Sequence, residues 1–111
     1  MSTLSTHVLD TMHGCPAAGM EVTLRGPDGL QASGVTNADG RCPDLISGDL
    51  PPGSYELAFA LADYFRARGV TLPDPPFLDV VTIAFGIAPE GGHYHVPLLA
   101  SPFAYSTYRG S

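Results

Sequence analysis

Two histidines, His93 and His95, stand two residues apart in a stretch of β-forming residues near the end of the chain. Side chains two apart on a strand point to the same face of its sheet, so the two imidazoles are expected on one surface. A third histidine, His7, stands in a strand-like pattern at the start of the chain, and Arg41 follows a turn sequence. Histidine exchanges protons near neutral pH, and arginine offers a planar fork of donors to carbonyl-rich or anionic ligands. These residue types suit acid–base chemistry on a small polar substrate.

The residues alone leave three interpretations open. In the first, His7 and His95 act as acid and base and Arg41 is their electrostatic partner. In the second, His93 and His95 chelate zinc, which needs three or four protein ligands. Further ligands for such a site are available in His7, His13, Cys15 and Cys42. In the third, these side chains form an ordinary solvated surface.

The chain end also carries groups that can bind a ligand. Residues 103–108 keep β-forming side chains almost to the last position, although chain ends are usually poorly ordered unless something ties them down. We therefore expect this terminus to be built into the fold. The guanidinium of Arg109, the hydroxyl of Ser111 and the α-carboxylate would then form a ligand-binding corner.

The elements that must position these residues are short and rich in turns. The chain contains 13 glycines and 11 prolines without any low-complexity run, which indicates many turns. Alternating apolar and polar residues predict strands over 4–9, 20–25, 30–36, 54–61 and 77–85, and a C-terminal strand pair split at Ser101-Pro102. Helix formers before Gly69 predict one short helix over 62–68. Seven or eight strands with one helix predict an all-β antiparallel sandwich.

Composition limits the classes of partner. The chain has 111 residues, which is the size of one domain covering residues 1–111, and a net charge of −6. Only five basic residues are present and they are scattered, which argues against a nucleic-acid partner. No apolar run is long enough for a membrane helix and no signal peptide is visible, so the expected location is the cytoplasm. Two reduced thiols are expected at Cys15 and Cys42.

Four segments of the chain resemble one known family, the 5-hydroxyisourate hydrolases, which are the transthyretin-related proteins of urate breakdown. The segment YSTYRGS at 105–111 is similar to the C-terminal signature of that family, and HYHVPLL at 93–99 continues the match upstream. LSTHVLDT at 4–11 resembles its opening motif, and TNADGRC at 36–42 resembles its middle motif. The resemblance spans the whole chain, and His13 is an extra histidine in a variable loop.

The resemblance implies a transthyretin-like sandwich of two four-stranded antiparallel sheets with one short helix. It also implies a homotetramer, a dimer of dimers, with active sites at the dimer–dimer interface. The implied reaction is metal-independent and needs no cofactor: hydrolysis of 5-hydroxyisourate to 2-oxo-4-hydroxy-4-carboxy-5-ureidoimidazoline in purine catabolism. The implied catalytic residues are His7, Arg41 and His95. The implied substrate-binding residues are Tyr108, Arg109, Gly110 and Ser111.

Besides a metal-binding module at His93 and His95, two further interpretations are alternatives to a hydrolase. One is a ligand carrier of the transthyretin type, in which a hydrophobic molecule occupies the central channel and no chemistry occurs. A carrier needs mostly apolar walls, whereas two histidines, an arginine and a carboxylate are costly to bury unless they are paired. The other is a purely structural sandwich, which gives no reason for a terminus built into the fold.

Overall fold

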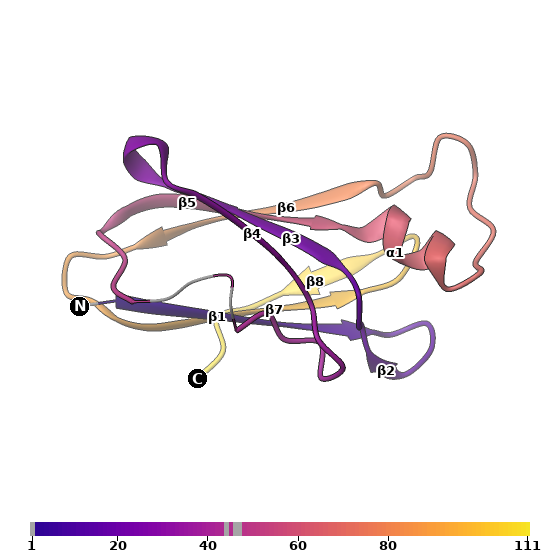
Figure 1. Cartoon of the computed structure of the whole chain (residues 1–111), viewed down its shortest axis with the longest axis horizontal. Helices are drawn as coiled ribbons and strands as arrows, with labels where there is room; N and C mark the ends of the chain where they lie inside the picture. The colour runs from indigo at the N-terminus through magenta and orange to yellow at the C-terminus, as the bar shows by residue number, and fades with distance from the viewer. Residues whose placement is uncertain (1, 44, 46–47) are drawn as a thin grey trace.

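The protein is a sandwich of two four-stranded sheets, seen edge-on in Figure 1. This computed structural model describes residues 2–43, 45 and 48–111. The first sheet, sheet A, has the strand order β2-β1-β7-β8. Its strands are β1 (Ser2–Asp10), β2 (Cys15–Pro16), β7 (Gly92–Ala100) and β8 (Tyr105–Thr107). The division into two four-stranded sheets with one helix confirms the predicted fold class.

The second sheet, sheet B, has the order β4-β3-β5-β6, and all its neighbouring strands are antiparallel. Its strands are β3 (Glu21–Arg25), β4 (Gln31–Val35), β5 (Gly53–Ala60) and β6 (Val80–Ile87). A 3₁₀ turn, η1 (Pro27–Gly29), joins β3 to β4 at the predicted Gly-Pro-Asp-Gly sequence. These strands match the predicted ones to within a few residues at their ends.

Sheet A departs from the prediction in its short strand β2, for which no strand was predicted, and in the direction of its central pair. Its two central strands, β1 and β7, run parallel, with Ser2 opposite Gly92 and Asp10 opposite Ala100. The other pairs in this sheet, β1 with β2 and β7 with β8, are antiparallel as expected. Short strands joined by tight turns favour antiparallel neighbours, whereas a parallel pair needs a long crossover connection. Here the whole of sheet B forms that connection, which no local pattern reveals.

The core lies between the sheets and follows the alternation of each strand. In β1, Leu4, Thr6 and Val8 are buried, while Ser5 and His7 on the other face are only partly so. The largest buried aromatic side chains are those of Tyr55, Phe59 and Phe65. Because each strand faces the core with every second residue, the polar residues of β1 and β7 are left on the outer face of sheet A.

The helix α1 (Leu61–Ala67) closes one end of the sandwich. It begins one residue earlier than predicted and buries Tyr64 and Phe65. No helix in the described part of the chain has the length and apolar character required to span a membrane.

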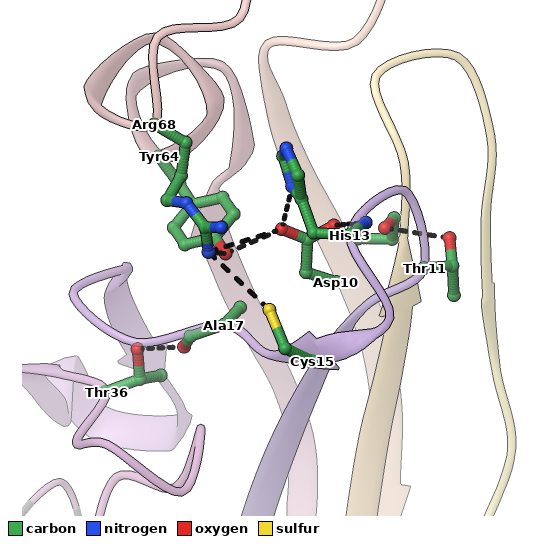
Figure 2. Close-up of polar contacts among 9 residues, drawn as sticks. Asp10, Thr11, His13, Cys15, Ala17, Thr36, Tyr64 and Arg68 are labelled. Carbon is green, nitrogen blue, oxygen red and sulfur yellow. Dashed lines mark hydrogen bonds and ion pairs between the residues drawn. The ribbon is translucent and has the colours of Figure 1, made fainter.

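A buried carboxylate ties α1 to the end of β1 (Figure 2). The hydroxyl of Tyr64 donates to Asp10 Oδ2 at 2.7 Å, and His13 contacts the same oxygen through Nδ1 at 2.6 Å. Arg68 lies 3.8 Å from Asp10 and donates to the Tyr64 hydroxyl and to the Cys15 thiol. Burial alone would raise the pKa of Asp10, but hydrogen bonds from Tyr64 and His13 outweigh it and hold that pKa below its ordinary value. Burial and the hydrogen bond to Asp10 raise the pKa of Tyr64 to about 12.

Candidate active site

Arg41 is placed beside His7 by a rigid turn that follows β4. The side-chain oxygen of Asn37 accepts hydrogen bonds from the backbone N–H groups of Asp39 and Arg41, each at 3.0 Å. The turn is also bonded to β1, because the N–H of Val8 donates to the Gly40 carbonyl at 2.9 Å. His7 and Arg41 are consequently bridged partners on neighbouring backbones. Bridged partners project toward the same face of a sheet, so this turn delivers the guanidinium to the outer face of sheet A.

The turn can approach β1 only because residue 40 is a glycine. Gly40 has φ +74°, a conformation that other residues adopt at a cost. A Cβ atom at this position would also lie 2.5 Å from the carbonyl oxygen of Val8. The close approach therefore fixes the base from which Arg41 projects.

His95 reaches the same face from β7. The parallel register places His95 opposite Ser5 and Pro97 opposite His7, so the two histidines lie on adjacent strands, two residues out of register. Nδ1 of His95 lies 2.7 Å from the hydroxyl of Ser5. The structure thus brings His7, Arg41 and His95 together from three separate segments of the chain.

The surroundings favour the neutral form of His95. Partial burial lowers its pKa most, followed by the charge of Arg41 and by His7 and His93 when they are protonated. A hydrogen bond with the Ser5 backbone acts in the opposite direction and is outweighed. A neutral imidazole near pH 7 can accept a proton at one ring nitrogen and donate from the other.

The chain end is tied to β7 directly beside His95. The N–H of Gly110 donates to the His95 carbonyl at 2.8 Å. A Cβ atom at Gly110 would lie 2.4 Å from Cδ2 of the His95 ring, so the backbone here packs against the imidazole. Arg109 is anchored with its guanidinium 4.2 Å from the centre of the Tyr94 ring. The terminus is built into the fold, as predicted.

The terminal residues do not all face the histidines. Tyr108 and Arg109 line an open cavity of about 440 Å³ at the edge of the sandwich, together with Phe85 and Tyr94. Tyr94 alternates with His95 along β7 and points to the opposite face of the sheet. Among the predicted substrate-binding residues, Gly110 is therefore the one whose contact with the His95 ring is direct, and Ser111 follows it.

The cavity beside Arg41 is small. It encloses about 100 Å³ and is lined by Leu4, Ser5, Thr6, Arg41, Cys42 and Pro43. Small-molecule sites usually enclose about 300–1,000 Å³. The described residues of one chain thus enclose less space beside Arg41 than a small-molecule site usually has, and neither His7 nor His95 lines it.

The sequence as a whole matches one protein family. The family described as HIUase/Transthyretin matches residues 4–110. The chain belongs to the HIUase/Transthyretin family. A family relative, the 5-hydroxyisourate hydrolase of Pseudomonas aeruginosa, is 55% identical over 117 residues, which cover 100% of this chain and 93% of the relative.

Solved structures that superpose on this chain include a hydrolase and a transthyretin. The Klebsiella pneumoniae 5-hydroxyisourate hydrolase superposes with a TM-score of 0.86 at 38% identity, covering 99% of this chain and all (100%) of that one. Sea bream transthyretin in complex with thyroxine superposes with a TM-score of 0.83 at 34% identity, covering 96% of this chain and 93% of that one. The fold is thus shared by a hydrolase and by a transthyretin that was crystallised with thyroxine.

A metal site finds no support in the described residues of this family member. No three histidine, cysteine, aspartate or glutamate side chains among them are grouped as ligands. His93 and His95 both contact the hydroxyl of Ser5, and His13 contacts Asp10 at the end of β1. Both cysteines are thiols rather than halves of a disulfide, as expected.

Sequence reasoning missed the partners of the two β7 histidines. Thr3 contacts His93 and Ser5 contacts both His93 and His95. The signal that could have found them is the alternation of Thr3, Ser5 and His7 along β1, which matches the alternation along β7. It was invisible because pairing of β1 with β7 was not predicted.

Proposed function

We propose that the protein hydrolyses 5-hydroxyisourate to 2-oxo-4-hydroxy-4-carboxy-5-ureidoimidazoline, a step of urate breakdown. The observation that carries this proposal is the meeting of His7, Arg41 and His95 on one face of sheet A, at positions that the sequence motifs single out. Full-length relatives named 5-hydroxyisourate hydrolase support the choice of substrate.

The reaction adds water to a ring amide carbonyl and breaks the adjoining C–N bond. His7 draws a proton from the attacking water, and Arg41 steadies the substrate oxygens and the negative charge that develops on the carbonyl. His95 positions the water or passes a proton to the leaving nitrogen. Gly110 and Ser111 shape the pocket beside His95, and Tyr108 and Arg109 complete the substrate-binding terminal segment. The reaction uses no metal and no cofactor.

The whole chain, residues 1–111, acts in this proposal as one hydrolase domain that assembles into a homotetramer, a dimer of dimers. The small cavity beside Arg41 supports this arrangement. It encloses only about 100 Å³, so a further wall is needed for it to hold a bicyclic substrate. A neighbouring subunit packed over the outer face of sheet A would supply it. The cytoplasm, expected from the sequence, is the proposed location.

The direct test adds purified protein to 5-hydroxyisourate generated from urate by urate oxidase and follows the ultraviolet absorbance. We expect acceleration over the spontaneous decay. The variants His7→Ala and His95→Ala should each lose about 10²–10⁴-fold in kcat, the usual contribution of general acid–base catalysis, and keep the wild-type assembly. A chain truncated before Tyr108 should also lose activity.

The alternative outcomes are equally specific. Near-full activity in either histidine variant would remove that histidine from the mechanism. Absence of acceleration by folded wild-type protein would refute the hydrolase proposal and favour a ligand carrier, as in the structurally similar sea bream transthyretin.

A further inference from the structure

A row of alternating hydroxyl and imidazole groups runs along the outer face of sheet A. The parallel register places Thr3 opposite His93 and Ser5 opposite His95. The Thr3 hydroxyl lies 2.6 Å from Nδ1 of His93, and the Ser5 hydroxyl lies 2.9 Å from Nε2 of the same ring. Ser5 also lies 2.7 Å from Nδ1 of His95. The Ser5 hydroxyl thus connects the exposed His93 to the partly buried His95, and the Thr3 hydroxyl contacts the other ring nitrogen of His93.

Every contact in this row can be satisfied in two opposite directions. In one direction His95 Nδ1–H donates to the Ser5 oxygen, the Ser5 O–H donates to His93 Nε2, and His93 Nδ1–H donates to Thr3. In the other, the Thr3 O–H donates to His93 Nδ1, His93 Nε2–H donates to Ser5, and the Ser5 O–H donates to His95 Nδ1. Ser5 donates one hydrogen bond and accepts one in either direction, and each neutral imidazole carries one proton, so every contact in the row has one donor and one acceptor. The two directions differ in which nitrogen of His95 holds its proton.

We propose that Ser5 is a positioning residue for His95, and that its hydroxyl links His95 to His93 in a proton relay that serves the hydrolysis proposed above. Nε2 of His95 has no hydrogen bond to the described residues and faces the substrate in this scheme. Its exchange of a proton with substrate is coupled, through Ser5 and His93, to an exchange between Thr3 and solvent.

The proton balance of the relay closes. When His95 Nε2–H gives its proton to the leaving nitrogen, the Ser5 proton moves to His95 Nδ1. The His93 Nε2 proton moves to the Ser5 oxygen, the Thr3 proton moves to His93 Nδ1, and the Thr3 oxygen takes one proton from solvent. The row then points in the opposite direction, and both imidazoles are neutral again. The reverse shift accompanies uptake of a proton by His95.

The charges around His95 disfavour its protonated form, which is why a relay would help. Arg41 and His7 reach His95 from the neighbouring turn and from β1, and His93 lies on the same strand. Gly110, with the Ser111 carboxylate after it, packs beside the ring from the chain end. A lasting positive charge on His95 would be repelled by Arg41 and by either histidine when protonated. A relay that passes the proton on avoids this cost.

The experiment compares Ser5→Ala with Ser5→Thr, which keeps the hydroxyl on a β-branched side chain. Ser33→Ala is the matched control, because Ser33 is an exposed hydroxyl on β4 whose only described partner is Thr23 at 3.3 Å. For Ser5→Ala we expect kcat for 5-hydroxyisourate to fall by about 10²-fold, as for a misplaced catalytic group, with little change in KM. Ser5→Thr should restore most of the loss, and Ser33→Ala should have no effect.

A second arm separates the relay from simple packing. His93→Gln should also lower kcat, and the double variant Ser5→Ala/His93→Gln should be no slower than Ser5→Ala alone, because both changes cut one path. Fully additive losses would overturn the relay. A Ser5→Ala enzyme with kcat within about twofold of the wild type, or impaired only in KM, would overturn the role of Ser5.

A third arm does not depend on activity. Relative to the folded wild-type protein, the ¹⁵N resonance of His95 Nδ1 should shift in Ser5→Ala. It should lie near its wild-type position in Ser5→Thr and in Ser33→Ala. An unchanged resonance would overturn the positioning of His95 even if the enzyme were active. If this resonance behaves as expected but wild-type protein does not accelerate decay of 5-hydroxyisourate, the proposed substrate fails and the relay is refuted as a part of that hydrolysis.

Discussion

His95 is the imidazole at the chemical centre of the proposed site. Burial lowers its pKa most, and the fields of Arg41, His7 and His93 lower it further. A neutral His95 is the form that takes part in proton exchange in the proposed reaction. The contribution of His95 to the rate should therefore be present at neutral pH and lost as the pH falls through its lowered pKa, below the ordinary 6.5.

Arg41 provides a test of this electrostatic argument. Arg41→Gln removes a positive charge near His95, so the pKa of His95 should rise toward its ordinary value. Arg41→Lys keeps the charge and should leave the pKa lowered, although it loses the planar fork of donors and with it much of the activity. An NMR titration of the histidine ring protons measures both variants. An equal pKa for His95 in wild-type protein and Arg41→Gln would show that Arg41 does not act on His95 electrostatically.

Three elements must meet for the site to form: β1, β7 and the turn at 37–41. The turn approaches β1 at Gly40. The φ of +74° at Gly40 and its closeness to the Val8 carbonyl both exclude a side chain there. Gly14 is a matched position, because its φ is +69° but no atom lies within 4 Å of a Cβ placed there. Replacing either glycine should cost conformational energy, but only the replacement of Gly40 should displace Arg41.

We expect Gly14→Ala to lower the free energy of unfolding by roughly 1–2 kcal/mol, the cost of a left-handed backbone, with activity unchanged. Gly40→Ala should lower it further and reduce kcat. Urea unfolding and the absorbance assay measure the two effects. Equal activity in the two variants would show that the close approach of Gly40 to β1 does not position Arg41.

The junction between β1 and α1 makes stability depend on pH. The pKa of Asp10 is lower in the folded chain than its ordinary value of 3.8, so the ionised carboxylate stabilises the fold above that pH. This stabilisation is lost as the pH falls through the lowered, folded-state pKa. Asp10→Asn should cost about 1.5–3 kcal/mol at neutral pH, the usual value of hydrogen bonds to a charged group.

Asp63→Asn is the control for this prediction, because Asp63 pairs with Arg66 at 3.8 Å on the surface of α1. Such a pair contributes about 0–1 kcal/mol. Urea unfolding from pH 7 to pH 3 should show the difference between wild-type protein and Asp10→Asn shrinking as the pH drops below 3.8. A difference independent of pH would mean that the charge of Asp10 does not stabilise the fold.

The elements themselves were largely predictable, since period-two alternation and turn residues define most strands of both sheets. The turn at 37–41 was also predictable, because asparagine and aspartate bond their own backbone at such positions. The parallel pairing of β1 with β7 was not, because it joins residues about ninety positions apart and depends on packing of the whole sandwich. The row of Thr3, His93, Ser5 and His95 follows from that pairing, which explains why local patterns could not reveal it.

At the scale of the whole molecule, the proposed tetramer would add a second chain beside Arg41, where the cavity formed by the described residues is only about 100 Å³. Light scattering coupled to gel filtration should give four times the chain mass of 11.6 kDa. Specific activity should fall on dilution wherever the tetramer dissociates. A monomer with full activity would show that one chain suffices.

The pairing of β1 with β7 also decides when the catalytic face can form. The partners of the sheet B strands, from Glu21 to Ile87, all precede β7 in the chain, whereas β1 comes first and its main partner β7 comes near the end. During translation β1 must therefore wait, apart from its short contact with β2, until residues 92–100 have left the ribosome. Joining two such distant segments closes a loop of nearly the whole chain, which is slow compared with forming local pairs. The face that carries His7 and His95 consequently cannot form until β7 has been synthesised.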